Sequence, residues 1–436
     1  MKKVLVIGAA KSGIAAAKLL KRHGYEVILT DQKEIKEKNK LEEDGMIVYD
    51  NGHPASLKNT GYEFVVKNPG IRYNVDIIDY FVRNHVKIYT EIEIAYRYAK
   101  KFHYGAVTGT NGKTTITSML EACLKMNHRA LAAGNIGTPL SEIVFEHEDE
   151  EKDIALELSN FQLLGIETFR PEVSVVCNLA PDHLDYMPTL ESYYESKMRI
   201  AMNQKEDDWF LRNVDDETVM HYAKNIQCEI IDFSLKRQDV DLYVCNGEAL
   251  LRGKHLFYVK DLKVVGEHNI SNAMIAAAMA IKMGVSYENV EKALKEFKGI
   301  EHRIEYIGEK EGVSFYNDSK ATNTQAACIA LASFEKNILL LAGGKDKGIS
   351  FDELHDYDER VKHAFTFGQT KEKIAAEFTH STTCETMQEA LEKAFDIAQK
   401  GDVILLSPAC SSYDQFDNYE QRGDLFREAC LRIIHA

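Results

Sequence analysis

The sequence predicts an α/β protein of three domains, each built on a mostly parallel sheet. Short apolar runs recur along the chain, polar or glycine-bearing turns follow them, and stretches with helical spacing lie between them. A chain of 436 residues has room for two to four domains of about 100–200 residues each. The changes in pattern place the boundaries so that the predicted domains are 1–93, 94–298 and 299–436.

The first predicted domain opens like a Rossmann-type domain. An apolar strand at 4–7 leads into the turn 8–13 and a helix, and a second strand ends at Asp31, where an acidic residue commonly meets a ribose or base. Ala10 stands where the dinucleotide fingerprint has its second glycine, which weakens a nicotinamide interpretation and leaves another nucleotide. A strand-end turn at 68–70 lies on the ligand-binding face of such sheets, although simple chain reversal explains it nearly as well.

The central domain carries the strongest motif, a glycine-bearing loop at 109–115 between a buried strand and a helix. Backbone N–H groups of such a loop surround phosphate oxygens, while Lys113 reaches the outer phosphates and Thr114 faces a magnesium ion. The usual pattern has a glycine where this chain has Val107, so the loop is two residues shorter. An ordinary strand-to-helix turn is the alternative, but the flanking strand and helix favour a triphosphate site.

Polar groups that suit a metal follow this loop. Two adjacent predicted strands deliver Glu157 and the pair Asp182-His183 to the sheet edge where Thr114 also points. Oxygen and imidazole ligands suit Mg²⁺, and the coincidence of three such groups favours a metal site over ordinary solvated side chains. Helix periodicity alone, by contrast, predicts that Lys197 is a surface lysine. Short strand-like pieces at 206–265 predict a small β insertion.

The third domain repeats the doubly wound pattern. Its predicted strands lie at 313–316, 337–341, 363–367 and 402–406, and polar turns follow each of them. Three of those turns bring Lys320, Lys347 and Ser412 to one sheet edge, where lysine and hydroxyl groups can hold carboxylates. The sequence therefore predicts an anion site on this domain as well.

Composition excludes several classes of protein. A net charge of −15 argues against a nucleic-acid or acidic-membrane surface as partner. Eight scattered cysteines without paired metal spacing favour reduced thiols in the cytosol. Lys11 and Lys18 interrupt the N-terminal apolar run, so a signal peptide is rejected, and no stretch approaches a membrane span. We expect a cytoplasmic monomer that binds neither nucleic acid nor membrane.

Across the whole chain, these motifs resemble the Mur ligases, the ATP-dependent amino-acid ligases of peptidoglycan synthesis. The short loop 108–114 is the family's own form, which accounts for Val107. Shared motifs also stand at 157–163, 178–185, 268–269, 302–303 and 318–323. The stretches 407–416 and 420–426 resemble the member that adds D-glutamate to UDP-N-acetylmuramoyl-L-alanine through an acyl phosphate.

The resemblance implies a role for each matching position. ATP would contact Gly109, Thr110, Asn111, Gly112, Lys113, Thr114, Thr115, Asn272, Arg303 and Asp318. The sugar nucleotide would contact Ser12, Gly13, Asp31, Asn68, Gly70 and Asn135, and D-glutamate would contact Thr322, Lys347, Ser412 and Tyr419. Two magnesium ions would be held by Thr114, Glu157, His183 and Lys197, and the catalytic groups would be Lys113, His183 and Lys197.

Two positions have a particular meaning within the resemblance. Lys197 stands where related ligases carry a carbamylated lysine, which replaces the surface interpretation. A neutral lysine reacts with CO₂, and the carbamate supplies anionic oxygens for a second magnesium ion. Tyr419 stands where relatives are expected to carry phenylalanine, a departure in the glutamate pocket.

Three other functions compete with this one. Another Mur-type ligase or a folylpolyglutamate synthetase would share the central domain, but the latter lacks a nucleotide-sugar domain before the phosphate loop. A nucleotide switch would leave the Lys347 and Ser412 turns without a function. An NAD-dependent enzyme is disfavoured by the incomplete glycine fingerprint.

Overall fold

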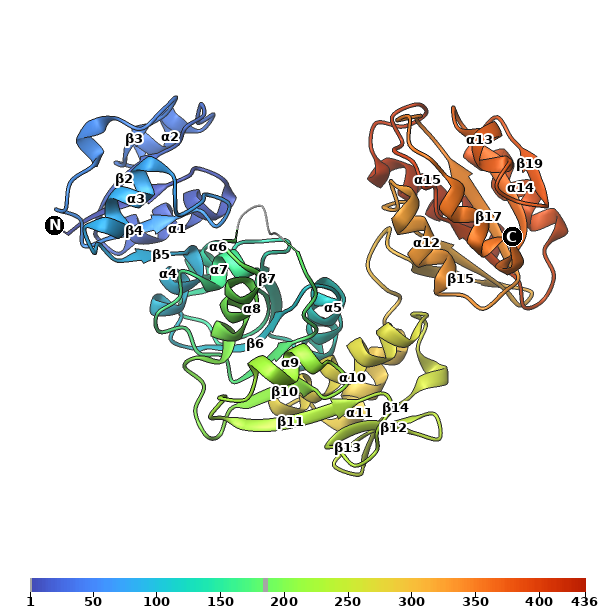
Figure 1. Cartoon of the computed structure of the whole chain (residues 1–436), viewed down its shortest axis with the longest axis horizontal. Helices are drawn as coiled ribbons and strands as arrows, with labels where there is room; N and C mark the ends of the chain where they lie inside the picture. Colours follow the sequence, from blue (N-terminus) through green and yellow to red (C-terminus); the bar gives the residue numbers. More distant parts are fainter. Residues whose placement is uncertain (1, 183–186) are drawn as a thin grey trace. The chain divides into compact units, whose positions relative to one another are not determined.

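The computed structural model describes residues 2–182 and 187–436, and it has the predicted α/β architecture with three sheets (Figure 1). The chain divides into two compact units, one of Met1–Val259 with Ser271–Leu294 and one of Lys260–Ile270 with Lys295–Ala436. The first unit holds two sheets and the second unit holds one. In the described part of the chain, no helix is both long and apolar enough to cross a membrane.

The N-terminal sheet has five parallel strands in the order β3-β2-β1-β4-β5. Its strands are β1 (Lys3–Ile7), β2 (Glu26–Thr30), β3 (Ile47–Tyr49), β4 (Phe64–Lys67) and β5 (Ile88–Tyr89), and its helices are α1 (Lys11–Arg22), α2 (Lys38–Glu43), η1 (Ala55–Leu57) and α3 (Asp76–Arg83). The strand order reverses between β1 and β4. Open α/β sheets bind ligands at such a switch point, beyond the carboxyl ends of the strands.

The central sheet has nine strands in the order β14-β13-β12-β11-β10-β9-β6-β8-β7. These are β6 (Phe102–Thr108), β7 (Ala130–Gly134), β8 (Lys152–Glu157), β9 (Val173–Val176), β10 (Trp209–Asn213), β11 (Glu229–Ser234), β12 (Leu242–Cys245), β13 (Glu248–Leu251) and β14 (Lys254–Tyr258). Strands β7 to β11 run parallel with β6, and β12 to β14 form an antiparallel meander at the edge. The strand-like pieces at 206–265 thus extend the central sheet itself.

Helices join and cover this sheet. They are α4 (Glu91–Tyr98), α5 (Lys113–Leu124), η2 (Lys125–Asn127), α6 (Leu140–His147), α7 (Asn160–Leu163), α8 (Leu190–Met198), η3 (Arg199–Ala201), α9 (Glu217–Tyr222), η4 (Val259–Asp261), α10 (Glu267–Lys282) and α11 (Tyr287–Glu296). Strand β6 is central and buried, so the loop that follows it lies between the ends of β8 and β9.

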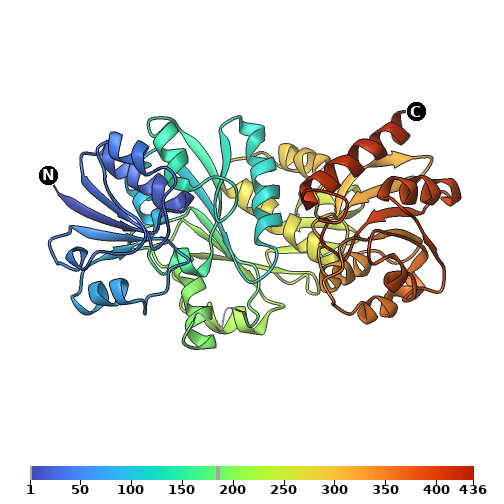
Figure 2. The ribbon, with the colours of Figure 1, turned by 90° about the horizontal axis from the view of Figure 1, so that it is seen from above.

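The C-terminal sheet has six strands in the order β15-β16-β20-β17-β18-β19, of which only β15 is antiparallel. Its strands are β15 (Glu305–Lys310), β16 (Val313–Asn317), β17 (Ile338–Gly343), β18 (Val361–Phe367), β19 (Ser381–Thr383) and β20 (Val403–Leu406), and its helices are α12 (Thr324–Ala332), η5 (Asp352–Arg360), α13 (Lys371–Ala375), α14 (Met387–Ile397) and α15 (Tyr419–His435). Alternate residues of β17 and β20 enter two separate apolar clusters, so helices cover both faces (Figure 2).

One buried carboxylate joins α4 to the segment before β9. Glu93 is fully buried and accepts hydrogen bonds from the backbone N–H groups of Glu167, Thr168 and Phe169, at 2.9, 2.9 and 3.1 Å. Arg97 Nε lies 2.9 Å from the same carboxylate. Buried backbone donors are costly to leave unpaired. Glu93 therefore fixes the backbone at residues 167–169, just before β9 of the central sheet.

We predict that Glu93→Ala destabilises the first unit by about 3 kcal/mol, because three backbone donors and Arg97 lose their acceptor. Thermal unfolding followed by circular dichroism should show an earlier first transition. The exposed Glu43 of α2 offers the matched control, and Glu43→Ala should leave that transition in place. An unchanged first transition in Glu93→Ala would mean that the carboxylate does not anchor the segment.

Candidate active site

The loop between β6 and α5 requires glycine at two positions. Gly109 has φ of +147°, and a Cβ there would lie 3.1 Å from the Cys177 backbone nitrogen. Gly112 has φ of +85°, and a Cβ there would lie 2.9 Å from Asn272 Oδ1. L-residues rarely adopt such backbone conformations. The predicted loop glycines are therefore required by the backbone itself, and Asn272 lies against the loop as part of the first unit.

The segment after β9 holds this loop in place. Asn178 Oδ1 accepts a hydrogen bond from the Asn111 N–H at 2.9 Å, and Asn178 Nδ2 donates to the Asn111 carbonyl at 3.0 Å. Thr110 Oγ1 donates to the Ala180 carbonyl at 3.1 Å and accepts from the Ala180 N–H at 3.0 Å. The loop is thus fixed before any ligand binds, which lowers the entropic cost of binding.

Two lysine ammonium groups share one carbonyl oxygen in this loop. Lys113 Nζ donates to the carbonyls of Gly109 and Thr110 at 3.0 and 2.8 Å. Lys197 Nζ donates to the same Gly109 carbonyl at 2.7 Å and lies 4.7 Å from the centre of the Tyr193 ring. The Gly109 carbonyl therefore brings a lysine of α8 beside the phosphate-loop lysine. The interpretation of Lys197 as a surface residue is wrong, since only 2% of it is exposed.

Burial, together with the charge of Lys113, lowers the pKa of Lys197 to about 7. The neutral amine of Lys197 is therefore far more accessible at neutral pH than that of an exposed lysine. A neutral amine is a nucleophile, whereas an ammonium group is not. The site thus places an amine with a lowered pKa next to the phosphate-loop lysine.

Glu157 ends β8 on the other side of β6. Its carboxylate is buried, and Oε1 accepts a hydrogen bond from Asn135 Nδ2 at 2.9 Å. Glu157 Oε2 is also buried, and it accepts no hydrogen bond from any residue that the structure describes. The strands β8 and β9, predicted to be adjacent, are separated by β6. Strand order depends on contacts distant in sequence, and here it places Glu157 and the 177–182 segment on opposite sides of the loop.

The donor set at this edge fits a hard divalent cation. Glu157 offers an unpaired carboxylate oxygen, and the half-buried Thr114 offers a hydroxyl at the start of α5. His183, predicted as a further ligand, lies outside the described residues. Within residues 2–182 and 187–436, no group of three or more His, Cys, Asp or Glu gathers as a metal site.

The N-terminal turns meet at the β1/β4 switch point. Asp31 accepts hydrogen bonds from the N–H groups of Ala9 and Lys33, at 2.6 and 2.8 Å, and so shapes the 8–13 turn. Asn68 Nδ2 donates to Ser12 Oγ at 3.1 Å, and Asn68 Oδ1 accepts from the Gly70 N–H at 3.2 Å. The structure thus brings Ser12, Asn68 and Gly70 together at this sheet edge.

Gly13 packs directly against this turn. A Cβ at Gly13 would lie 1.9 Å from the Gly8 carbonyl oxygen, so no larger residue fits. Close approach of α1 to the turn keeps the helix N-terminus at the sheet edge, where it favours an anion.

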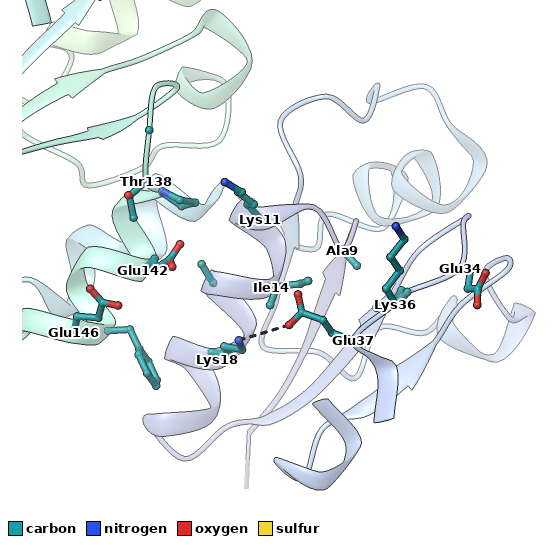
Figure 3. Close-up of a pocket in the computed structure, with 15 residues that line it drawn as sticks. Ala9, Lys11, Ile14, Lys18, Glu34, Lys36, Glu37, Thr138, Glu142 and Glu146 are labelled. Carbon is teal, nitrogen blue, oxygen red and sulfur yellow. Dashed lines mark ion pairs between the residues drawn. The ribbon is translucent and has the colours of Figure 1, made fainter. Parts of the chain in front are cut away.

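A cavity of about 680 Å³ borders the same turn (Figure 3). Lys11 and Lys18 of α1 line one side of it, and Glu142 and Glu146 of α6 line the other. Lys18 Nζ lies 4.0 Å from Glu37 Oε2. The cavity walls therefore combine charges of both signs, with lysines from α1 beside the N-terminal sheet and carboxylates from α6 beside the central sheet.

In the second unit, two turns after parallel strands are tied together. Asp318 Oδ2 accepts a hydrogen bond from Ser407 Oγ at 2.7 Å, and burial raises the pKa of Asp318 to about 7. Arg422 is fully buried and donates to the carbonyls of Ser319 and Cys410 at 2.8 and 3.1 Å. Arg422 thereby links the turn after β16 to the turn after β20.

The predicted acid-binding residues lie on these turns. Lys347 is exposed, Ser412 is buried, and Thr322 and Tyr419 are half-buried. The Tyr419 ring has Lys320 Nζ 5.7 Å from its centre, and the Tyr419 carbonyl accepts from Ser319 Oγ at 2.8 Å. Arg303 and Asp318, predicted to contact ATP, belong to this second unit, whereas Asn272 belongs to the first.

Comparison with known proteins decides the family. The model of the Mur ligase middle domain matches residues 107–280, and the model of the Mur ligase glutamate ligase domain matches residues 302–410. The UDP-N-acetylmuramoylalanine--D-glutamate ligase of Bacillus subtilis (strain 168) is 40% identical over 436 residues, covering 98% of this chain and 96% of the relative. That of Geobacillus sp. (strain WCH70) is 41% identical, covering 99% and 98%. The chain belongs to the Mur ligase family.

Solved structures agree with this fold. A UDP-N-acetylmuramoyl-L-alanyl-D-glutamate--2,6-diaminopimelate ligase superposes on this Mur ligase with a TM-score of 0.63 at 18% identity, over 95% of this chain and 94% of the other. The UDP-N-acetylmuramate-alanine ligase of Thermotoga maritima gives a TM-score of 0.54 at 20% identity, over 99% and 100%. At these identities, the likeness concerns the three-domain fold alone.

Sequence reasoning assigned no role to two residues that fix functional turns, one in each unit of this Mur ligase. Asn178 holds the phosphate loop, and it was visible only as the first residue of the 178–185 motif, directly after an apolar strand. Arg422 ties the C-terminal turns, and it was visible only as part of the 420–426 motif, because nothing in a local pattern shows that an arginine is buried.

The buried ammonium of Lys197 should weaken the folded Mur ligase. A lysine pKa that falls on folding gives a penalty that is fully present below about pH 7 and disappears as the pH rises toward the unfolded value. We predict that Lys197→Met stabilises the first unit by about 2 kcal/mol at about pH 6, and by less at about pH 9. Urea unfolding at both pH values measures this difference.

The exposed Lys205 provides the matched control, and Lys205→Met should leave stability unchanged at both pH values. Destabilisation by Lys197→Met at the lower pH would instead make Lys197 a structural residue.

Proposed function

We propose that this chain is the ATP-dependent ligase that joins D-glutamate to UDP-N-acetylmuramoyl-L-alanine in the synthesis of peptidoglycan precursors. The observation that carries the proposal is the 40% identity to a relative named for this reaction, over 98% of the chain. The geometry supports it, because a phosphate loop, a reactive lysine and an unpaired carboxylate oxygen surround the end of β6.

Amide synthesis needs an activated carboxylate, because a free carboxylate is a poor electrophile. The L-alanine carboxylate attacks the γ-phosphorus of ATP, ADP leaves, and an acyl phosphate forms. The neutral amine of D-glutamate then attacks the acyl carbon, inorganic phosphate leaves with the bonding electron pair, and the proton that the nitrogen loses ends on the released phosphate. The chain's contribution is to hold the reacting groups in line and to compensate charge on the transferring phosphoryl group.

The phosphate loop supplies most of that compensation. The N–H groups that begin a helix have no acceptors within it, so those at the start of α5 would be available to phosphate oxygens. Lys113, now bonded to the Gly109 and Thr110 carbonyls, would turn to the β- and γ-phosphates. The ATP-binding set proposed here is Gly109, Thr110, Asn111, Gly112, Lys113, Thr114, Thr115 and Asn272, with Arg303 and Asp318 from the second unit.

Lys197 would act as a carbamate. The ammonium form first loses a proton, the neutral amine attacks the carbon of CO₂, an N–C bond forms and a second proton leaves, so that a cation beside Lys113 becomes an anion. The lowered pKa and the neighbouring ammonium support this step, because the modification replaces repulsion with attraction. Magnesium, held by Thr114, Glu157, His183 and the Lys197 carbamate, would stabilise negative charge on the phosphates.

The remaining substrates would bind at the other two sheet edges. Within the proposed domain 1–93, Ser12, Gly13, Asp31, Asn68 and Gly70 would meet the sugar nucleotide, together with Asn135 of the central domain, 94–298. In the proposed domain 299–436, Thr322, Lys347, Ser412 and Tyr419 would hold D-glutamate. We place the enzyme in the cytoplasm as a monomer, where all three substrates meet it.

Phosphate release tests the function. With ATP, magnesium and UDP-N-acetylmuramoyl-L-alanine present, D-glutamate should trigger release, whereas L-glutamate, L-lysine and L-alanine should leave it at background, because the proposed acceptor site is specific for D-glutamate. Release that needs no D-glutamate, or that prefers L-lysine or L-alanine, would assign the chain to another ligase.

A small carboxylic acid added to the solution should partly replace a missing carbamate on Lys197. We predict that Lys197→Ala lowers kcat by at least about a hundredfold, since an anionic ligand near the phosphoryl group is lost. Formate or acetate should restore part of the activity in this variant and none in Lys113→Ala. Lys205→Ala serves as the unaffected control. Full activity in Lys197→Ala would exclude the carbamate role.

A further inference from the structure

Lys67 is a fully buried lysine that the proposed reaction leaves unused. It ends β4, and 0% of it is exposed. Its Nζ donates hydrogen bonds to three backbone carbonyls of the following turn, those of Asn68 and Pro69 at 3.1 Å and that of Ile71 at 2.7 Å. A charged group is costly to bury unless each of its donors is satisfied, and here three carbonyls satisfy three N–H bonds.

The turn that Lys67 holds lies at the switch point of the N-terminal sheet. Its Asn68 side chain donates to Ser12 Oγ, and it packs so closely that a Cβ on Gly8 would lie 2.6 Å from Asn68 Cβ. The N–H groups of the turn are also paired within the fold, since the Asn68 N–H donates to the Ile7 carbonyl at 2.9 Å and the Ile71 N–H donates to the Asn68 carbonyl at 3.0 Å. The Gly70 N–H itself bonds Asn68 Oδ1.

We propose that Lys67 is a positioning residue for the sugar nucleotide, whose ammonium group holds the 68–70 turn in the conformation that a uridine diphosphate sugar meets. The inference rests on the proposed function of the N-terminal domain. It adds that recognition at this edge depends on a charge inside the fold, which fixes backbone direction and contributes a positive potential toward a diphosphate.

The surroundings of Lys67 make this arrangement sensitive to pH. Burial lowers the pKa of Lys67 to about 8. The Tyr73 ring lies with its centre 4.7 Å from Nζ. Burial raises the pKa of Tyr73, and the charge of Arg199 in η3 opposes that rise. Among the described residues, no carboxylate pairs with Lys67. Below about pH 8 the ammonium serves all three carbonyls, and above it the neutral amine has two N–H bonds for three acceptors.

Calorimetric titration of the full chain with UDP-N-acetylmuramoyl-L-alanine, without ATP or D-glutamate, tests the proposal. Lys67→Met should weaken binding about tenfold at about pH 7, because it removes the charged donors and keeps the side-chain length. Wild type should bind more weakly at about pH 9 than at about pH 7, whereas Lys67→Met should bind equally at both. Lys67→Arg should recover part of the affinity.

Controls separate positioning from folding. Lys58→Met, which removes a lysine paired with Asp76 at the surface of the same sheet, should bind as wild type does. In turnover, Lys67→Met should raise KM for the sugar nucleotide and leave kcat and KM for ATP within about twofold. If Lys67→Met lowers the thermal transition, Lys67→Arg and the wild-type pH dependence decide the question.

Wild-type affinity in Lys67→Met, or wild-type binding independent of pH, would overturn the role of Lys67 and leave the proposed function intact. Failure of the wild-type chain to bind the sugar nucleotide at all would overturn both.

Discussion

The sharing of the Gly109 carbonyl by Lys113 and Lys197 is the interaction on which the rest of the active site depends. A carbonyl oxygen has two lone pairs, but two ammonium groups that meet at it repel each other. The fold maintains this contact because Asn178 and Thr110 fix the loop and α8 buries Lys197. Such an arrangement favours neutralisation of one lysine and attracts anions to the other, which are the two properties that a phosphoryl-transferring ligase needs.

The same principle recurs at the other two sheet edges. Turns after parallel strands carry the polar groups. A buried cation fixes the backbone of these turns, Lys67 in the N-terminal sheet and Arg422 in the C-terminal sheet. In each case the cation donates to backbone carbonyls and so fixes the conformation of the turn. Anionic substrates can thus be bound by a chain with a net charge of −15, because each edge has its own local field.

Local patterns predicted most of the strands and the phosphate loop, because apolar runs and glycine turns report on their own backbone. They predicted neither strand order nor the burial of charged residues. Strand β6 separates β8 from β9 through contacts distant in sequence, and Lys197, Lys67 and Arg422 are buried by elements far along the chain. Helix periodicity predicts a surface position for Lys197, and within the sequence only the resemblance to a family pointed to a different one. The roles assigned to residues 302–303 and 318 stay predictions that the second unit alone does not test.

The carbamate proposed on Lys197 is the central claim about the active site, and carbon-13 NMR tests it directly. The protein would be equilibrated with ¹³C-bicarbonate in the presence of magnesium, a non-hydrolysable ATP analogue and the sugar nucleotide. A protein-bound carbamate resonance should appear in wild type and in Lys205→Met and be absent from Lys197→Met. A wild-type spectrum without that resonance, or one that persists in Lys197→Met, would contradict the account.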